Sequence, residues 1–92
     1  MRPLTSAVPG ALAHLLRDAP LSNGKVAFAW RVAVGPAMER ATALHLEGTS
    51  LGVDVTTAQW AGEIRRSSGI ILARLQTLLG KETVAELVVR SR

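Results

Sequence analysis

Apolar residues recur every three to four positions in the first third of the chain, a spacing that predicts two amphipathic helices. The first spans residues 7–17, and its apolar face consists of Val8, Leu12, Leu15 and Leu16. Ser22 is a suitable N-cap for the second helix, and Gly35-Pro36 predicts its end or a change of direction. The buried stripe of this second helix is predicted to consist of Val26, Ala27, Trp30 and Val34.

The hydrophobic period changes to two in the middle of the chain, which is typical of strands with one buried face. In the first predicted strand, Leu44 and Leu46 alternate with Ala43, His45 and Glu47. In the second strand the inward residues are Leu51, Val53 and Val55. The turn Gly48-Thr49-Ser50 between the two runs predicts a β-hairpin.

A helical period returns after Thr56-Thr57, either of which can cap the new helix. Its apolar stripe consists of Trp60, Ala61, Ile64, Ile71, Leu72, Leu75, Leu78 and Leu79. The run Ser67-Ser68-Gly69 predicts a kink or a split within this helix, and Gly80 predicts its end. A last strand follows, with Ala85, Leu87 and Val89 on one face and Glu86 and Arg90 on the other.

The order of elements is therefore α-α-β-β-α(α)-β. Because the last strand follows a long helix, it can return by a crossover and pair in parallel with its neighbour. We predict an α+β fold in which a three-stranded mixed sheet carries helices on one face. The chain of 92 residues is expected to form a single domain over residues 1–92, with residues 1–6 flexible.

Composition excludes several kinds of site. Hydrophobic residues make up 48% and charged residues 20% of the chain, as in an ordinary folded domain. Because the chain has no cysteine, it has no disulfides or thiolate metal ligands. His14 and His45 lack companions at metal-ligand spacing, so no metal is expected. No apolar run reaches the ~20 residues needed to cross a bilayer, and the N-terminus does not fit a signal peptide. A cytoplasmic protein is expected.

Catalytic chemistry has no recognisable pattern in the sequence. There is no Gly-x-Ser-x-Gly elbow and no glycine-rich phosphate loop. The carboxylates are not spaced as a general acid and base pair: Asp18, Glu39, Glu47, Asp54, Glu63, Glu82 and Glu86. We expect no catalytic residue, no cofactor and no small-molecule substrate.

Positive charge is the compositional clue to partners. Eleven Lys and Arg residues against seven Asp and Glu residues give a formal charge of +4, and a basic domain is typical of nucleic-acid binding. The candidates for phosphate contact are Arg65, Arg66, Arg74, Lys81 and Arg90, with Arg92 beyond them. The three arginines of the long helix are predicted to project away from its apolar stripe and form an exposed basic face. A merely solvated face is an equal alternative, and Glu63 can pair with Arg66.

The two tryptophans each lie on an apolar stripe, which favours core packing over base stacking. The predicted structural core consists of Trp30, Gly35, Trp60, Ile64 and Leu75.

The order and spacing of several segments closely resemble the DciA family (DUF721 domain). The matching segments are Trp30 to Gly35-Pro36, Leu46 to Val55, Ala58-Gln59-Trp60-Ala61-Gly62-Glu63-Ile64, Ile71 to Leu75, Leu79-Gly80 and Val84 to Arg90. The chain differs from the family in having Ala41-Thr42-Ala43-Leu44 where members usually have His-Thr-x-Pro, and in lacking a long basic tail. The resemblance implies a type II KH-like fold, although the Gly-x-x-Gly loop of true KH domains is missing.

The resemblance also implies a function in bacterial DNA replication. Family members work with the replicative DnaB-type helicase and need no active site of their own. The expected partners are therefore this helicase and, weakly and without sequence preference, single-stranded or forked DNA at the nucleoid. Two alternatives stay open: a KH-like RNA-binding module, and an adaptor that contacts only proteins.

Overall fold

Two helices, a β-hairpin, two further helices and a final strand follow one another along residues 19–91, the part of the chain that this computed structural model describes. The elements are α2 (Asn23–Val34), α3 (Pro36–Arg40), β1 (Thr42–Glu47), β2 (Ser50–Val55), α4 (Ala58–Arg66), α5 (Ser68–Leu79) and β3 (Glu86–Ser91). The helix predicted over residues 7–17 lies outside the described residues.

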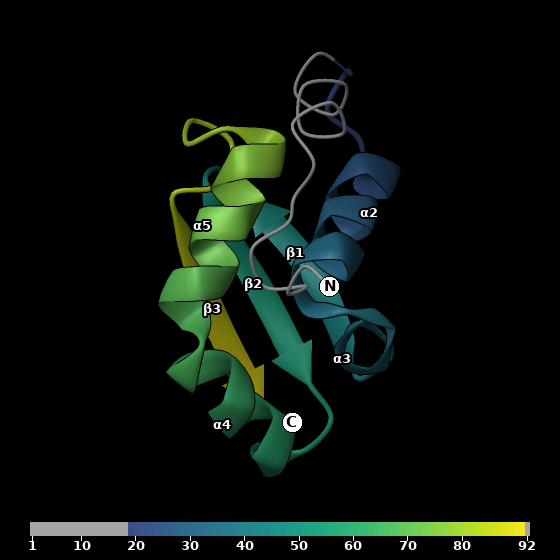
Figure 1. Cartoon of the computed structure of the whole chain (residues 1–92), viewed down its shortest axis with the longest axis vertical. Coiled ribbons are helices and arrows are strands. Elements are labelled where there is room, and N and C mark those ends of the chain that lie inside the picture. The colour runs from purple at the N-terminus through teal and green to yellow at the C-terminus, as the bar shows by residue number, and fades with distance from the viewer. Residues whose placement is uncertain (1–18, 92) are drawn as a thin grey trace, which may run out of the picture.

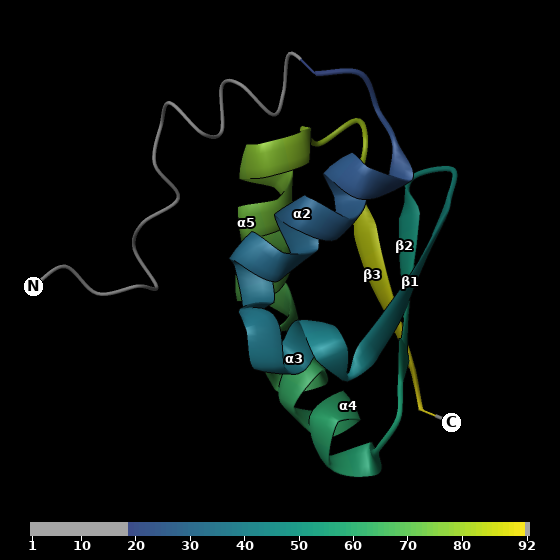
Figure 2. The ribbon, with the colours of Figure 1, turned by 90° about the vertical axis from the view of Figure 1, so that its right-hand side faces the viewer.

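The three strands form one mixed sheet in the order β1-β2-β3. β1 pairs antiparallel with β2, and β3 returns to pair parallel with β2. Figure 1 views the molecule from the side of the helices, and Figure 2 shows α2, α3, α4 and α5 together on one side of the sheet. The predicted α+β architecture, a mixed sheet with helices on one face, is confirmed, and its element order is that of a KH-like fold.

Capping residues set the limits of α2 as predicted. The Ser22 side chain accepts a hydrogen bond from the Lys25 backbone N–H at 3.1 Å, which satisfies one of the free donors at the helix start. The helix ends at Gly35, whose φ of +89° is accessible mainly to glycine. Pro36 then begins the short helix α3, which the sequence analysis did not predict as a separate element.

The long C-terminal helix is split into two, which agrees with one of the predicted outcomes. Thr57 is the residue that caps α4, because its hydroxyl accepts from the Trp60 N–H at 3.1 Å. Ser67 separates α4 from α5, and Gly80 ends α5 with a φ of +94°.

The core lies between the helices and the inner face of the sheet, where the side chains of Leu51, Val53 and Val55 are fully buried. α2 contributes Val26, Ala29, Trp30 and Ala33, a stripe with helical spacing. Ala27 was predicted in this stripe but is exposed. The prediction was wrong because Ala27 lies about 100° around the helix from Val26.

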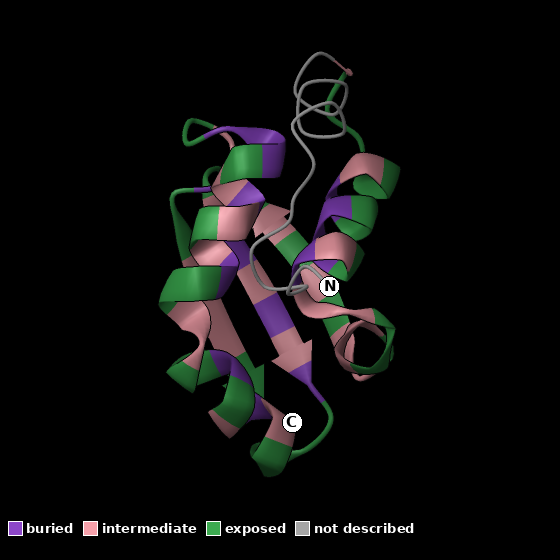
Figure 3. Ribbon diagram, viewed as in Figure 1, coloured by how far each residue is buried: buried purple, intermediate pink, exposed green. Residues whose placement is uncertain are grey.

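Figure 3 shows the buried residues gathered where the helices face the sheet. Trp30 is 1% exposed, and Ile64 and Leu75 are fully buried, in line with their predicted core role. Trp60 differs from that prediction, because it is only partly buried at the edge of the core. Ala85 also differs: it precedes β3 and is exposed.

Candidate nucleic-acid interface

The last turn of α4 carries two exposed arginines, Arg65 and Arg66. Cations are favourable at this place because the C-terminal end of a helix carries partial negative charge. Thr57 at the other end fixes where α4 begins, and the buried Ile64 fixes its rotation against the core. The two guanidinium groups therefore lie at the solvent side of the helix, as predicted.

Arg65 connects the end of α4 to β3, at the edge of the sheet, through a hydrogen bond. Its Nη2 donates a hydrogen bond to the backbone oxygen of Val89 in β3 at 3.2 Å. The Val89 side chain faces the helices, because it lies in register with the fully buried Val53. Among residues 19–91, Arg65 makes no ion pair. Its positive charge is therefore not neutralised by a neighbouring carboxylate.

Arg66 pairs with Glu63 one turn earlier, which confirms the predicted pairing. The Arg66 side chain is 68% exposed and that of Glu63 50%, so the pair contributes little to stability. The guanidinium also lies close to Gly62, where an added Cβ would be 3.4 Å from Nη1. Arg66 is thus held near the helix surface, with its charge partly neutralised.

Arg90 follows Val89 in β3 and is exposed on the opposite face of the sheet. Its Cα is in register with that of Asp54 on β2. Together with His45, Glu47, Ser50, Gly52 and Val88 it lines a shallow hollow of about 200 Å³ on this helix-free face. Arg65 and Arg90 therefore lie on the two sides of the β3 edge. We name Arg65, Arg66 and Arg90 the basic corner.

Arg74 and Lys81 do not belong to the basic corner. Arg74 was predicted to project into solvent, but it is only partly exposed, and its Nη1 donates to the backbone oxygen of Ala33 at 2.8 Å. That carbonyl lies in the last turn of α2, where helix carbonyls lack intrahelical partners. Lys81 follows α5 and is separated from α4 by the whole length of that helix. Arg92 lies outside the described residues.

Trp60 lies beside the basic corner on α4. With Gln59 and Glu63 it lines a hollow of about 340 Å³, and its ring is partly exposed. Trp60 is in helical phase with the buried Ile64, which indicated burial. Helical phase alone does not show that Trp60 lies at the edge of the core, where its side chain stays partly exposed. Part of the indole is therefore accessible one turn away from the Glu63–Arg66 pair.

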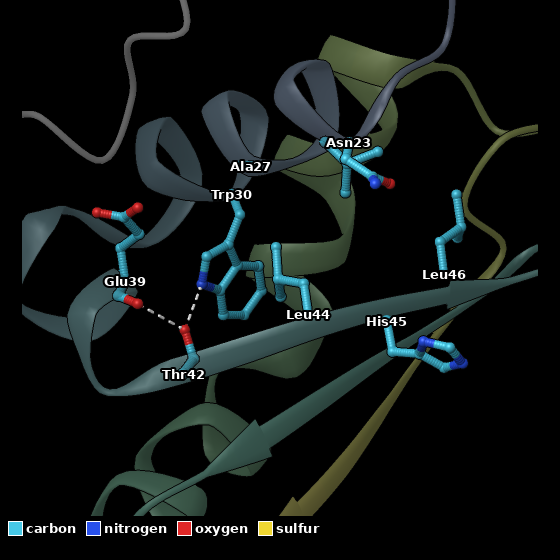
Figure 4. A pocket seen from close by; sticks show the side chains of 9 residues that line it. Asn23, Ala27, Trp30, Glu39, Thr42, Leu44, His45 and Leu46 are labelled. Atoms are coloured by element: carbon cyan, nitrogen blue, oxygen red, sulfur yellow. Dashed lines mark hydrogen bonds between the residues drawn. The ribbon is translucent and has the colours of Figure 1, made fainter.

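A larger groove of about 600 Å³ lies between α2 and β1 (Figure 4). At its floor, the Trp30 Nε1–H donates to the Thr42 hydroxyl at 2.9 Å, and this hydroxyl lies 3.0 Å from the backbone oxygen of Glu39. Leu44 and Leu46 line the groove from the edge strand and are half-buried. The sequence predicted that Leu44 and Leu46 lie on the same side of a half-buried strand, but it gave no sign that a groove separates this strand from α2.

Other site classes find little support in the described residues. Residues 19–91 contain no cluster of three or more His, Cys, Asp or Glu side chains able to hold a metal ion. Within the same range, no helix is long and apolar enough to span a membrane.

Two comparisons with known proteins bear on this arrangement. The sequence model of one protein family, described as "Dna[CI] antecedent, DciA", matches residues 3–89. A search of the curated proteins found no match to the chain. The family match extends over α2 to α5, the β-hairpin and the first part of β3.

Proposed function

The chain belongs to the DciA family, and we propose that it is a non-enzymatic adaptor of DNA replication that binds the DnaB-type replicative helicase and assists its loading on DNA. The family match over residues 3–89 is the observation that carries this proposal. Membership implies a role tied to the loading of this helicase. An adaptor of this kind needs surfaces for its partners and no catalytic residue or nucleotide of its own. It would act in the cytoplasm, at the replication fork.

We propose that DNA contact is weak, direct and independent of sequence, and that the basic corner makes it. The unpaired charge of Arg65 and the exposed guanidinium of Arg90 flank the β3 edge, so phosphates can approach from either face of the sheet. Arg66 adds a partly neutralised charge. So small a set of contacts favours low affinity, and because the contacts are ionic, the affinity falls as salt is raised.

The alternative that an observation favours is a KH-like module that binds single-stranded RNA. The partly exposed Trp60 beside the Glu63–Arg66 pair supports it, because aromatic rings and arginines together bind unstacked bases. A purely protein-binding adaptor would need neither the ring nor the basic corner.

A binding experiment with purified components separates the three functions. The chain is titrated into the helicase of the same organism, into a labelled single-stranded DNA and into the matching RNA. We expect a complex with the helicase, and weak, salt-sensitive binding of DNA. Binding of RNA much tighter than DNA, with no helicase complex, would replace the adaptor by the RNA-binding module. If the chain binds the helicase but binds neither DNA nor RNA at low salt, the result would support an adaptor that contacts only proteins.

The variant Arg65→Ala/Arg66→Ala/Arg90→Ala is compared with the control Arg40→Ala in the same titrations. Arg40 is an exposed arginine on α3 whose Nε donates a hydrogen bond to the Pro36 carbonyl of its own helix at 3.3 Å. Loss of DNA binding in the triple variant and its retention in the control would support the basic corner. A loss of binding free energy in the triple variant only about three times that in the control, in proportion to the charges removed, would show that DNA responds only to net charge.

A further inference from the structure

The strand β1 lies at an edge of the sheet, because among residues 19–91 it pairs with β2 alone. An edge strand leaves half of its backbone N–H and C=O groups without partners in the sheet, and proteins often protect such an edge with a proline, a lysine or a β-bulge. β1 has neither proline nor lysine, and its register with β2 runs without a bulge from Thr42 to Glu47. Its outer edge therefore has none of these three protections.

The backbone groups of β1 that point away from β2 belong to Leu44 and Leu46. The Ala41 carbonyl accepts a hydrogen bond from the Thr56 N–H at 3.3 Å, at the end of the β1–β2 pairing. Bonded and non-bonded residue pairs alternate in an antiparallel ladder, so every second residue counted from Ala41 bonds to β2, and the residues between them face outward. Within residues 19–91, no turn or loop supplies a backbone hydrogen bond to Leu44 or Leu46. An added strand would satisfy their N–H and C=O groups.

The groove between α2 and β1 provides space for the side chains of such a strand. It has a volume of about 600 Å³, and Leu44 and Leu46 line it from β1. On the α2 side it is lined by the exposed Ala27, whose methyl group fills little of the space. Figure 4 shows the Leu44 side chain directed toward α2 and that of His45 on the other side of β1. Because directly opposed residues of paired strands share a face, apolar side chains opposite the two leucines would enter this groove.

Glu39 gives one end of the groove a negative charge. It is half-buried, and Figure 4 shows it beside Thr42, with Leu46 at the opposite end of the groove. Among residues 19–91, the Glu39 carboxylate makes no ion pair. Charge complementarity therefore favours a segment that carries a Lys or Arg at the Thr42 end of β1.

A second copy of this chain meets these requirements less well than a segment of another protein. β1 itself contains no Lys or Arg, so pairing of β1 with β1 would bring no cation of the strand to Glu39. In β3, the other edge strand, the Val89 carbonyl already accepts a hydrogen bond from Arg65. The cation of β3, Arg90, lies on the helix-free face of the sheet and not on the side of the groove.

From these observations we propose that the outer edge of β1 and the groove between α2 and β1 bind an extended segment of another protein. The segment adds an antiparallel strand beside β1, which is a recurring form of peptide recognition. Its apolar side chains, at every second position, lie in the groove, and a Lys or Arg near its C-terminal end pairs with Glu39. The site is separate from the basic corner, and the proposal depends neither on the DNA contact nor on the helicase.

A peptide titration followed by NMR tests this binding mode. The probe is the end-blocked peptide Thr-Val-Thr-Val-Thr-Lys-Thr, added to the isotope-labelled full-length chain. In antiparallel pairing its two valines lie opposite Leu46 and Leu44, and its lysine lies near Glu39. We expect the amide signals of Leu44 and Leu46 to shift and their hydrogen exchange to slow, while Val89 of β3 is unaffected. Shifts centred elsewhere, or no shift at millimolar peptide, would overturn the proposal.

A concentration series without peptide tests for self-association. We expect the amide signals of Leu44 and Leu46 to stay constant as the chain is concentrated. Shifts of these two signals in the absence of peptide would show that a second copy occupies the edge, and would overturn the assignment to another protein.

N-methylation of the peptide separates strand pairing from simple apolar contact. Methyl groups on the nitrogens of both valines remove the N–H donors that face β1, whereas methyl groups on the two threonines that flank the second valine remove donors that face solvent. We expect the first peptide to bind at least about tenfold more weakly, because two hydrogen bonds are lost, and the second to bind almost as well as the parent. Equal weakening of both would contradict strand addition.

Charge reversal tests the role of Glu39. The wild-type chain should bind the lysine peptide about two- to fivefold more tightly than the same peptide with glutamate in place of lysine, and Glu39→Lys should reverse this preference. Glu86→Lys makes the same charge change at an exposed residue of β3 and should keep the wild-type preference. A preference that is unchanged in Glu39→Lys, or reversed in both variants, would contradict a basic segment paired with Glu39.

Discussion

Trp30 connects α2 to the first strand both through its buried ring and through its Nε1 hydrogen. The ring is 1% exposed, and the Thr42 hydroxyl that accepts its hydrogen bond lies at the start of β1. The same hydroxyl lies 3.0 Å from the carbonyl of Glu39 in α3. One indole therefore fixes the position of two helices relative to the edge of the sheet.

The two tryptophans should differ in their contribution to stability. Trp30→Ala is expected to lower the free energy of unfolding by about 3–5 kcal/mol, the usual cost of emptying a buried aromatic site. Trp60→Ala should cost clearly less, because part of its ring is already in contact with water. Urea unfolding of both variants measures the difference. Equal losses would mean that Trp60 is as buried as Trp30.

Arg74 is expected to act on stability rather than on DNA. Arg74→Ala removes the hydrogen bond to the Ala33 carbonyl, and hydrogen bonds of charged groups contribute roughly 1.5–3 kcal/mol. We expect a lower melting temperature and an unchanged salt dependence of DNA binding. A flatter salt dependence with unchanged melting temperature would instead place Arg74 at the DNA.

At the scale of elements, local sequence signals predicted most boundaries. Ser22, Thr57 and Gly80 set helix limits through contacts within one turn of the chain, and such contacts can be read from sequence. The hairpin and the parallel return of β3 followed from alternation and from the length of the crossover. These features depend on few distant neighbours, and they were predicted correctly.

The features that sequence could not predict depend on distant neighbours. Arg74 is turned toward α2 by a carbonyl 41 positions away, and nothing near Arg74 in the sequence indicates that contact. The partial exposure of Trp60 depends on where the core ends, not on helical phase. The helix α3 has five residues, too few to show a hydrophobic period. Of the candidate set, Arg65 and Arg66 lie together beside Arg90, while Lys81 lies at the far end of α5.

Two glycines on the same helix should respond to alanine with opposite sign. Gly80 ends α5 at a φ of +94°, and its added Cβ would also approach Glu82, so Gly80→Ala should destabilise the protein by about 1–3 kcal/mol. Gly69 has ordinary helical geometry and open space around it. Gly69→Ala should therefore stabilise the protein by about 0.4–1 kcal/mol. Thermal unfolding measures both, and a stabilising Gly80→Ala would contradict the capping role.

At the scale of the whole molecule, charge is distributed unevenly over the surfaces that the fold creates. The basic corner lies where α4 ends against β3, whereas the groove between α2 and β1 carries the acidic Glu39 among polar and apolar side chains. The molecule thus has a basic surface and, apart from it, a groove that is not basic. The proposed adaptor function would use two such separate surfaces.

Binding to single-stranded DNA should weaken as the salt concentration rises. Each phosphate contact contributes a slope of roughly −0.7 in a plot of log affinity against log salt concentration. Arg65→Ala/Arg66→Ala/Arg90→Ala should flatten this slope and lower affinity for all sequences alike. Fluorescence anisotropy with a labelled oligonucleotide measures the slope, and Arg40→Ala serves as the matched control. The same slope in the triple variant and the wild type would mean that the basic corner does not face DNA.

The most direct test of the adaptor function is a reconstituted helicase-loading assay on forked DNA. The helicase of the same organism is supplied with ATP and a single-strand-binding protein, with and without this chain, and strand separation is followed over time. We expect faster or more complete unwinding when the chain is present, and no ATP hydrolysis by the chain alone. Unwinding that stays unchanged over a wide range of chain concentrations, together with no helicase–chain complex, would contradict it.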